Sequence, residues 1–93
     1  MAVRQAEIET QHQAIEDFVH KALADVSGAL TSSLVVIGDK LGLYRALAPA
    51  PLTPAELAKR TETAERYVRE WCAAQAAAGY IEYDPATARY SLP

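Results

Sequence analysis

The stretch that decides the fold is LTPAELAKRTETAERYVREWCAAQAAAGYIEYDPATARYSL, residues 52–92. It contains a short helical segment, a polar turn, a longer helical run that ends at Gly79, and two strand-like segments around Asp84-Pro85. Apolar residues at 3- and 4-residue steps indicate the helices, and short β-type segments around a turn indicate a hairpin. A helix, a turn, a second helix and a hairpin in this order predict a winged helix-turn-helix.

The first helix of this stretch has a strong start signal. Thr53 stands at the N-cap position, Pro54 follows at the first helical position, and Glu56 completes a capping box. The longer helix is predicted over residues 64–78, with Thr63 as its cap. Both helix N-termini are predicted from cap residues that lie next to the helix in sequence.

The hairpin and the buried side of the longer helix complete the winged helix. Strands are predicted at residues 80–83 and 89–92, with Tyr83 opposite Tyr90. A buried amide at Gln75 needs hydrogen-bond partners, and we expect them to be backbone groups of neighbouring helices. The other positions predicted to face the core of the domain are Leu43, Leu47, Leu57, Ala58, Val68, Trp71 and Cys72.

Upstream of this stretch the sequence predicts two further helices, separated by Gly28. The first covers about residues 4–27 and has one apolar stripe. The second runs from 29 to 41, and Val35 and Val36 make its middle apolar nearly all round. A helix that is apolar on every side is buried on every side. We expect a partner subunit or a second domain to cover it, and burial by this chain's own helices is the alternative.

The predicted fold class is therefore mainly α. It is a winged helix-turn-helix over residues 29–93, preceded by an N-terminal helix over residues 1–28 that serves dimerisation. The small β-hairpin at the C-terminus is the wing. The predicted dimer interface consists of Phe18, Leu30, Leu34, Val35 and Ile37.

The charge distribution argues against polyanionic partners. The net charge is −3, and residues 1–28 carry five acidic against two basic side chains. The remaining 65 residues carry seven of each sign, so the half that would read DNA is neutral. Neither half has the excess of positive charge that attracts nucleic acid or anionic lipid.

Catalytic, metal and membrane signals are few. Two histidines, His12 and His20, with the single Cys72 are too few ligands for a zinc site. The longest strongly apolar run, residues 34–37, is far shorter than a membrane span. With one cysteine and no hydrophobic leader, we expect a cytoplasmic protein. We assign no catalytic, cofactor-binding or metal-binding residue.

Four segments in this order carry a family resemblance: VIGDKLGLYRAL (36–47), LTPAELA (52–58), ERYVREW (65–71) and GYIEYDPAT (79–87). Together they resemble the N-terminal winged-helix domain of bacterial class I S-adenosylmethionine-dependent methyltransferases. The resemblance implies a domain that dimerises and covers the substrate pocket, with Tyr44 as a candidate residue facing that pocket. It also implies that S-adenosylmethionine binds a Rossmann-like catalytic domain, which is absent from this chain.

No cofactor loop is present in the sequence itself. The four glycines include no Gly-x-Gly arrangement after a strand, so the sequence has no glycine-rich loop to bind the nucleotide part of the cofactor. We therefore expect no methyl transfer by the 93 residues alone. The methyl acceptor cannot be read from these residues.

The alternative function is a DNA-binding regulator, which commonly uses the same fold. Its contacts would be Arg66, Tyr67 and Arg69 on the longer helix. Glu65 lies four residues before Arg69, and Glu70 four after Arg66, so each arginine has an acid within reach. The segment from 62 to 70 has a net charge of −1 and would meet phosphate repulsion. This alternative is disfavoured.

Overall fold

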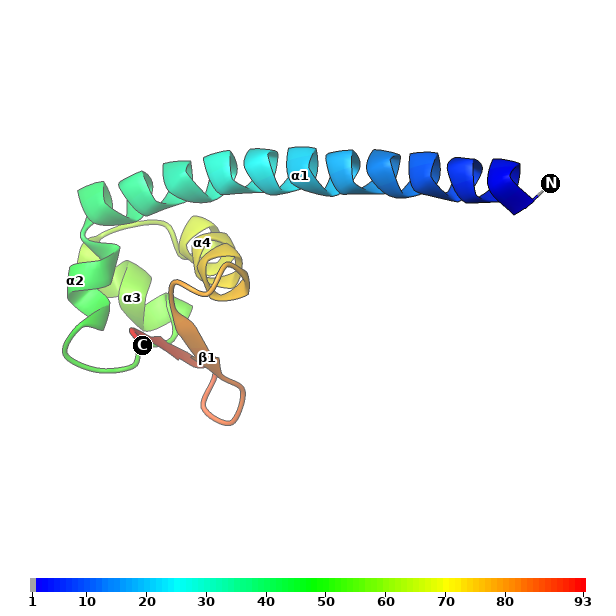
Figure 1. The fold of residues 1–93 in the computed structure, drawn as a ribbon. Helices are drawn as coiled ribbons and strands as arrows, with labels where there is room; N and C mark the ends of the chain where they lie inside the picture. The colour runs from blue at the N-terminus through cyan, green and yellow to red at the C-terminus, as the bar shows by residue number, and fades with distance from the viewer. Residues whose placement is uncertain (1) are drawn as a thin grey trace. The chain divides into compact units, whose positions relative to one another are not determined.

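The structure, a computed structural model, describes residues 2–93 and contains four helices and a two-stranded sheet among them. The helices are α1 (Ala2–Leu41), α2 (Leu43–Leu47), α3 (Pro54–Thr61) and α4 (Glu65–Ala77). The strands are β1 (Glu82–Asp84) and β2 (Arg89–Ser91). Figure 1 shows the order of these elements along the chain. The chain divides into two compact units, residues 1–30 and 31–93, which are described separately.

Helix α1 is continuous through Gly28, so the predicted break at this residue is wrong. A single glycine costs a helix only about 1 kcal/mol relative to alanine, which flanking helix formers can offset. A Cβ atom added at Gly28 would meet nothing within 4 Å. The glycine therefore neither ends the helix nor makes a close packing contact there.

In the first unit, every described residue from 2 to 30 is exposed. Large apolar side chains nevertheless recur at 3- and 4-residue steps on its helix, which places them on one face. We call this set the α1 stripe; it consists of Ile15, Phe18, Val19, Ala22, Leu23, Val26 and Leu30. An isolated helix of this kind is marginal in water without an apolar partner. The α1 stripe therefore needs a cover that residues 2–30 do not supply.

The second unit has a compact apolar core made by α2, α3, α4 and the hairpin. Its buried residues include the predicted core positions, which are confirmed: Leu43, Leu47, Leu57, Ala58, Val68, Trp71 and Cys72. Leu52 and Ile81 join them from the segments that flank α3 and α4. The confirmed core and the hairpin together establish the predicted winged helix-turn-helix.

Helix α3 begins with the predicted capping box. The backbone N–H of Glu56 donates to Thr53 Oγ1 at 3.2 Å, and the backbone N–H of Thr53 donates to Glu56 Oε1 at 3.1 Å. These two bonds satisfy donors that the first turn of a helix leaves unpaired. The hydrogen bonds from Thr53 hold the pKa of the Glu56 carboxyl below its ordinary value.

Helix α4 begins one residue later than predicted. Its N-cap is Ala64, which offers no side-chain hydrogen bond, so the prediction of Thr63 as the cap is wrong. The Thr63 hydroxyl instead shares a 2.8 Å hydrogen bond with Thr61 Oγ1, and its backbone N–H donates to Ala58 O at 3.0 Å. Thr63 therefore stabilises the turn between α3 and α4 rather than the start of α4.

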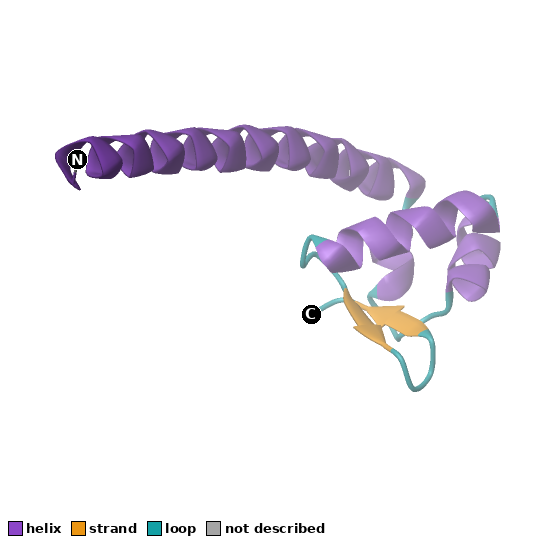
Figure 2. Ribbon diagram, turned by 90° about the vertical axis from the view of Figure 1, so that its right-hand side faces the viewer, coloured by secondary structure: helices purple, strands orange, loops and turns teal. Residues whose placement is uncertain are grey.

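The wing is a short antiparallel hairpin, shown by the orange strands and teal turn in Figure 2. Tyr83 pairs with Tyr90 as predicted, with ring centroids 4.7 Å apart. The first strand starts at Glu82, two residues later than predicted. Leu52 adds a third segment, because its N–H and C=O exchange hydrogen bonds of 2.9 and 2.8 Å with Tyr90. This bridge ties the wing to the segment before α3.

Candidate functional site

The indole of Trp71 joins α4 to the end of α1 within the second unit. Its Nε1–H donates a 2.9 Å hydrogen bond to the backbone carbonyl of Leu34, and the side chain is 4% exposed. The ring lies so close to Gly38 that a Cβ atom there would be 2.4 Å from Trp71 Cζ2. Only glycine leaves room for the ring against the backbone of α1. Glycine at position 38 therefore sets the distance between the two helices.

Tyr44 and Gln75 form a buried polar pair beside this indole. The Tyr44 ring meets Trp71 edge-on, with centroids 5.1 Å apart, and its hydroxyl donates to Gln75 Oε1. The prediction of backbone partners for the Gln75 amide is wrong, because its hydrogen-bond partner is the side-chain hydroxyl of Tyr44, 31 residues away in sequence. Gln75 is completely buried, and its Nε2 has no hydrogen-bond partner among the described residues. Burial raises the pKa of the Tyr44 hydroxyl, which stays a donor at neutral pH.

Replacing Tyr44 by phenylalanine is expected to destabilise the fold by about 1–2 kcal/mol, because the buried Gln75 amide then loses its remaining side-chain partner. Adding Gln75→Met should recover part of this loss, because removing both polar partners costs less than removing one. Urea unfolding of the two single variants and the double variant measures the coupling. Strictly additive losses would contradict the pairing.

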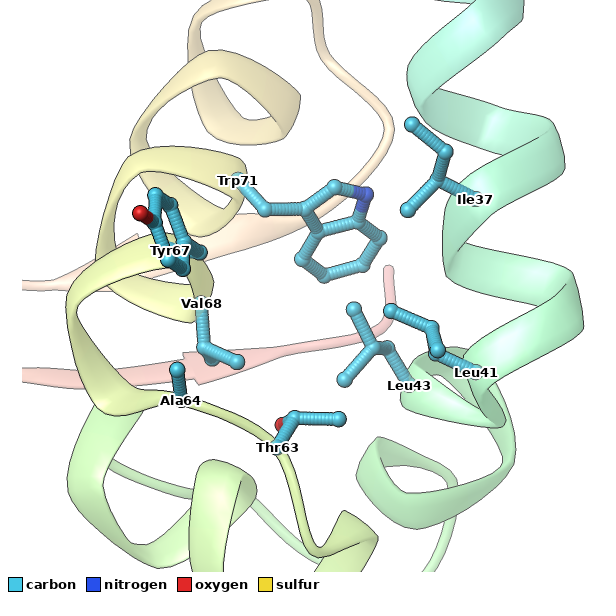
Figure 3. Close-up of a pocket in the computed structure, with 8 residues that line it drawn as sticks. All are labelled: Ile37, Leu41, Leu43, Thr63, Ala64, Tyr67, Val68 and Trp71. Atoms are coloured by element: carbon cyan, nitrogen blue, oxygen red, sulfur yellow. The ribbon is translucent and has the colours of Figure 1, made fainter.

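An apolar groove opens next to the Trp71 indole (Figure 3). It has a volume of about 290 Å³ and is open to solvent on one side. Its lining comes from the end of α1, the start of α2, the α3–α4 turn and the first two turns of α4. We call it the Tyr67 groove; it is lined by Ile37, Leu41, Leu43, Thr63, Ala64, Tyr67, Val68 and Trp71. Sequence reasoning did not identify this groove, because its lining residues come from four segments of the chain.

The residues predicted for a dimer interface occupy different environments. Phe18, Leu30 and Ile37 are 71%, 64% and 45% exposed. Leu34 and Val35 are half-buried, and Leu34 packs against the core of its own chain. Together with exposed Val36 and Leu41, these values contradict the alternative that this chain buries its apolar helix by itself. The exposed subset of the predicted residues remains accessible to a partner.

The residues named for DNA binding do not form a basic surface. Arg69 is paired with Glu65 at 2.6 Å, as its spacing predicts, and Arg89 of the wing lies 3.4 Å from Glu56. Arg66 is exposed, while Tyr67 lies along the apolar groove. A DNA-recognition helix needs cations directed at the phosphates and polar groups directed at the base edges. The observed pairing leaves α4 poorly suited to that task.

The described residues offer no evident centre for chemistry. No group of three or more His, Cys, Asp and Glu side chains among residues 2–93 is placed to hold a metal ion. Cys72 is completely buried, and burial raises the pKa of its thiol to about 11, so it is neutral and inert at pH 7. Both histidines are exposed on α1.

Cofactor geometry is likewise missing from this part of the chain. A nucleotide cradle of the Rossmann type needs a strand, a glycine-rich turn and a helix in succession. The sheet of residues 2–93 is the two-stranded hairpin, and no helix follows it within that range. These residues therefore do not fit S-adenosylmethionine.

Helix α1 also has a property that the short apolar run at residues 34–37 does not reveal. By length and composition alone, it is the one helix in residues 2–93 that could cross a membrane. The core helix of a soluble protein and a signal sequence can be just as long and apolar. The property therefore matches the exposure of the α1 stripe without identifying what covers it.

Comparisons with known proteins agree with the fold. The chain superimposes on part of PigF, in a structure with SAH, with a TM-score of 0.72 and 22% identity over 80% of this chain. It also superimposes on a putative O-methyltransferase from Nostoc punctiforme, with a TM-score of 0.68 and 20% identity over 74% of this chain. The match spans 21% of each of those two chains. No curated protein matches the sequence.

The sequence of residues 29–93 matches the Rv2258c-like winged HTH domain. This range covers more than half of the chain and contains the core, the Tyr67 groove and the wing. The match and the observed elements confirm the winged helix, and the structural neighbours show a similar fold in part of a putative O-methyltransferase. The protein therefore belongs to the family of Rv2258c-like winged helix-turn-helix domains.

Proposed function

We propose that this chain acts as the dimerisation and substrate-covering domain of a methyltransferase that uses S-adenosylmethionine. The observation that carries the proposal is the α1 stripe, a row of exposed apolar side chains on a helix with no apolar partner in its own unit. Burying such a row contributes about 25 cal/mol per Å² of apolar surface removed from water. A second copy is a partner of suitable chemistry that is always present at equal concentration.

The methyltransferase assignment rests on the fold and its neighbours. Both named structural neighbours contain this winged helix as a small part of a longer chain, and one of them is a putative O-methyltransferase. In the proposed arrangement, S-adenosylmethionine binds a catalytic domain outside residues 2–93 and supplies the methyl group. Residues of the winged helix near Tyr44 would shield the acceptor from water.

The alternative function, a DNA-binding regulator, has weaker support. Arg69 of α4 and Arg89 of the wing are paired with acids, and the net charge is −3. Membrane attachment through α1 is a further candidate by helix composition. The acidic excess of residues 1–28 disfavours anionic lipid.

The test is the solution mass of the full chain, measured by light scattering. We expect a dimer, and we expect Leu23→Gln with Leu30→Gln to weaken dimerisation by at least about tenfold, or 1.4 kcal/mol. Both leucines are exposed, at 60% and 64%, and glutamine keeps a good helix propensity.

A matched control carries Asp17→Gln with Ala24→Gln. These residues have the same seven-residue spacing but lie on the opposite side of α1, at about 100° of rotation per residue. The control should retain the wild-type mass. A monomeric wild-type chain, or equal weakening by both variants, would overturn the proposed dimer.

A further inference from the structure

We propose that residues 27–33 form a weak joint in α1, at which the helix opens reversibly while the segments on both sides stay helical. We call residues 27–33 the joint, residues 2–26 the arm and residues 34–41 the base. The boundary between the two compact units falls inside the joint, after Leu30. The inference concerns one chain and does not depend on the proposed dimer.

The joint is rich in residues that form helices poorly. Five of its seven residues are glycine, serine or threonine, which rank below alanine in helix propensity: Ser27, Gly28, Thr31, Ser32 and Ser33. The seven residues before the joint, 20–26, include none of these three types. Kinks are typical of glycine and serine pairs, and serine and threonine hydroxyls that bond to a carbonyl one turn earlier bend helices. Because α1 is continuous here, these residue types lower its local stability without ending it.

Tertiary packing contributes little to the joint. Six of its seven residues are exposed, and Thr31 is half-buried. A Cβ atom added at Gly28 would meet nothing within 4 Å, so the helix is not tightly packed at this point. Helical hydrogen bonds in exposed segments with few apolar contacts open more readily than those of a core. Composition and exposure therefore both favour local opening in the same seven residues.

Both flanks of the joint are better supported. In the arm, side-chain hydrogen bonds join residues one helical turn apart and stabilise the helix locally: Gln5 with Glu9, Gln13 with Asp17, and Lys21 with Asp25. The base is attached to the winged helix by the hydrogen bond from the Trp71 indole to Leu34 O and by the close approach of the ring to Gly38. The joint lies between these two supported segments.

The joint gives the α1 stripe a way to change direction. Six of the seven stripe residues lie in the arm, and Leu30 lies in the joint. Hinges in proteins are a few residues that absorb a change in backbone angles while the flanking elements move as rigid bodies. When the joint opens, the arm can turn its apolar face while the bond between Trp71 and Leu34 stays intact. The arm is therefore a movable strap, and the base is its fixed attachment.

Residue-resolved amide hydrogen exchange on the full chain tests the joint. We expect its amides to be at least about tenfold less protected than those of residues 20–26 and of the base, because local opening exposes them. Ser27→Ala with Gly28→Ala should raise their protection by about tenfold, since alanine favours the helix. The control, Thr10→Ala with His12→Ala, raises helix propensity in the arm and should leave protection of the joint unchanged.

Distances between nitroxide labels within one chain give a second measurement. Labels at Ala24→Cys and Lys40→Cys span the joint, and labels at Glu7→Cys and Ala24→Cys span a similar length of the arm. All three positions are exposed, whereas Cys72 is completely buried and does not compete for the label. An excess of unlabelled chain removes distances between copies. We expect a broader distribution across the joint than within the arm, and Ser27→Ala with Gly28→Ala should narrow it.

Two results would overturn the joint. Protection that declines smoothly from the base to the start of the arm would indicate fraying from the end of the helix instead of local opening. Equal widths of the two distance distributions would indicate a uniform helix. Both measurements refer to a single chain, so a monomeric mass in light scattering would overturn the proposed dimer and leave this test unaffected.

Discussion

Replacing Trp71 by alanine is expected to destabilise the winged helix by about 3–5 kcal/mol, the range for removing a large aromatic side chain from a core. The side chain is 4% exposed and contacts both Gly38 and Tyr44. It also donates the hydrogen bond to Leu34 O that links α4 to α1. For a domain with a total stability of about 5–15 kcal/mol, a loss of this size leaves a substantial unfolded population.

Urea unfolding followed by circular dichroism measures this loss. The measurement belongs in the Leu23→Gln, Leu30→Gln background, because dimerisation would make apparent stability depend on concentration. Tyr67→Ala is the matched control, since Tyr67 lies one turn earlier on α4 and is 72% exposed. We expect a change within about 0.5 kcal/mol for the control. Equal losses for the two aromatic residues would contradict the central position of Trp71 in the core.

Replacing Gly38 by alanine is expected to cost about 1–3 kcal/mol through overpacking. The added Cβ would lie 2.4 Å from Trp71 Cζ2 and 2.9 Å from Tyr44 Cε2, and both atoms belong to rings held within the core. The better helix propensity of alanine returns only about 1 kcal/mol. The two rings would have to shift, and the hydrogen bond between Trp71 and Leu34 would lengthen.

The same helix supplies the control for this substitution. Gly28→Ala adds the same methyl group to α1, where nothing lies within 4 Å, so it should stabilise the helix by about 0.5–1 kcal/mol. The two glycine variants are therefore expected to change stability in opposite directions. Thermal unfolding in the same background as above would detect each change as a shift of several degrees, at about 4–8 °C per kcal/mol. A stabilising effect at both positions would refute the close contact at Gly38.

Several predictions that depended on neighbouring residues were confirmed. The capping box at Thr53 and the pairing of Tyr83 with Tyr90 follow from residue types and short spacings, and both are present. The ion pair between Glu65 and Arg69 is another example. Such interactions form between groups that the local backbone already brings together. The sequence is sufficient to predict them.

Predictions that depended on competition between weak local signals failed. Gly28 was expected to end a helix, but its small intrinsic penalty is outweighed and α1 continues. Thr63 was expected to cap α4, but its hydroxyl shares a hydrogen bond with the Thr61 hydroxyl instead. The Thr63 hydroxyl could bond either to the start of α4 or to Thr61, and the geometry of the turn favours Thr61. The residue types alone do not rank these options.

By itself, the sequence determined the winged helix and its core positions, because these follow from periodicity, caps and turns. Only the tertiary structure decided that Gly38 receives the Trp71 ring, that Tyr44 pairs with Gln75, and that a groove opens beside Tyr67. Tyr44 and Gln75 are 31 residues apart, and Trp71 and Leu34 are 37 apart. Contacts at such separations depend on how whole helices pack, and that packing is set by all side chains together.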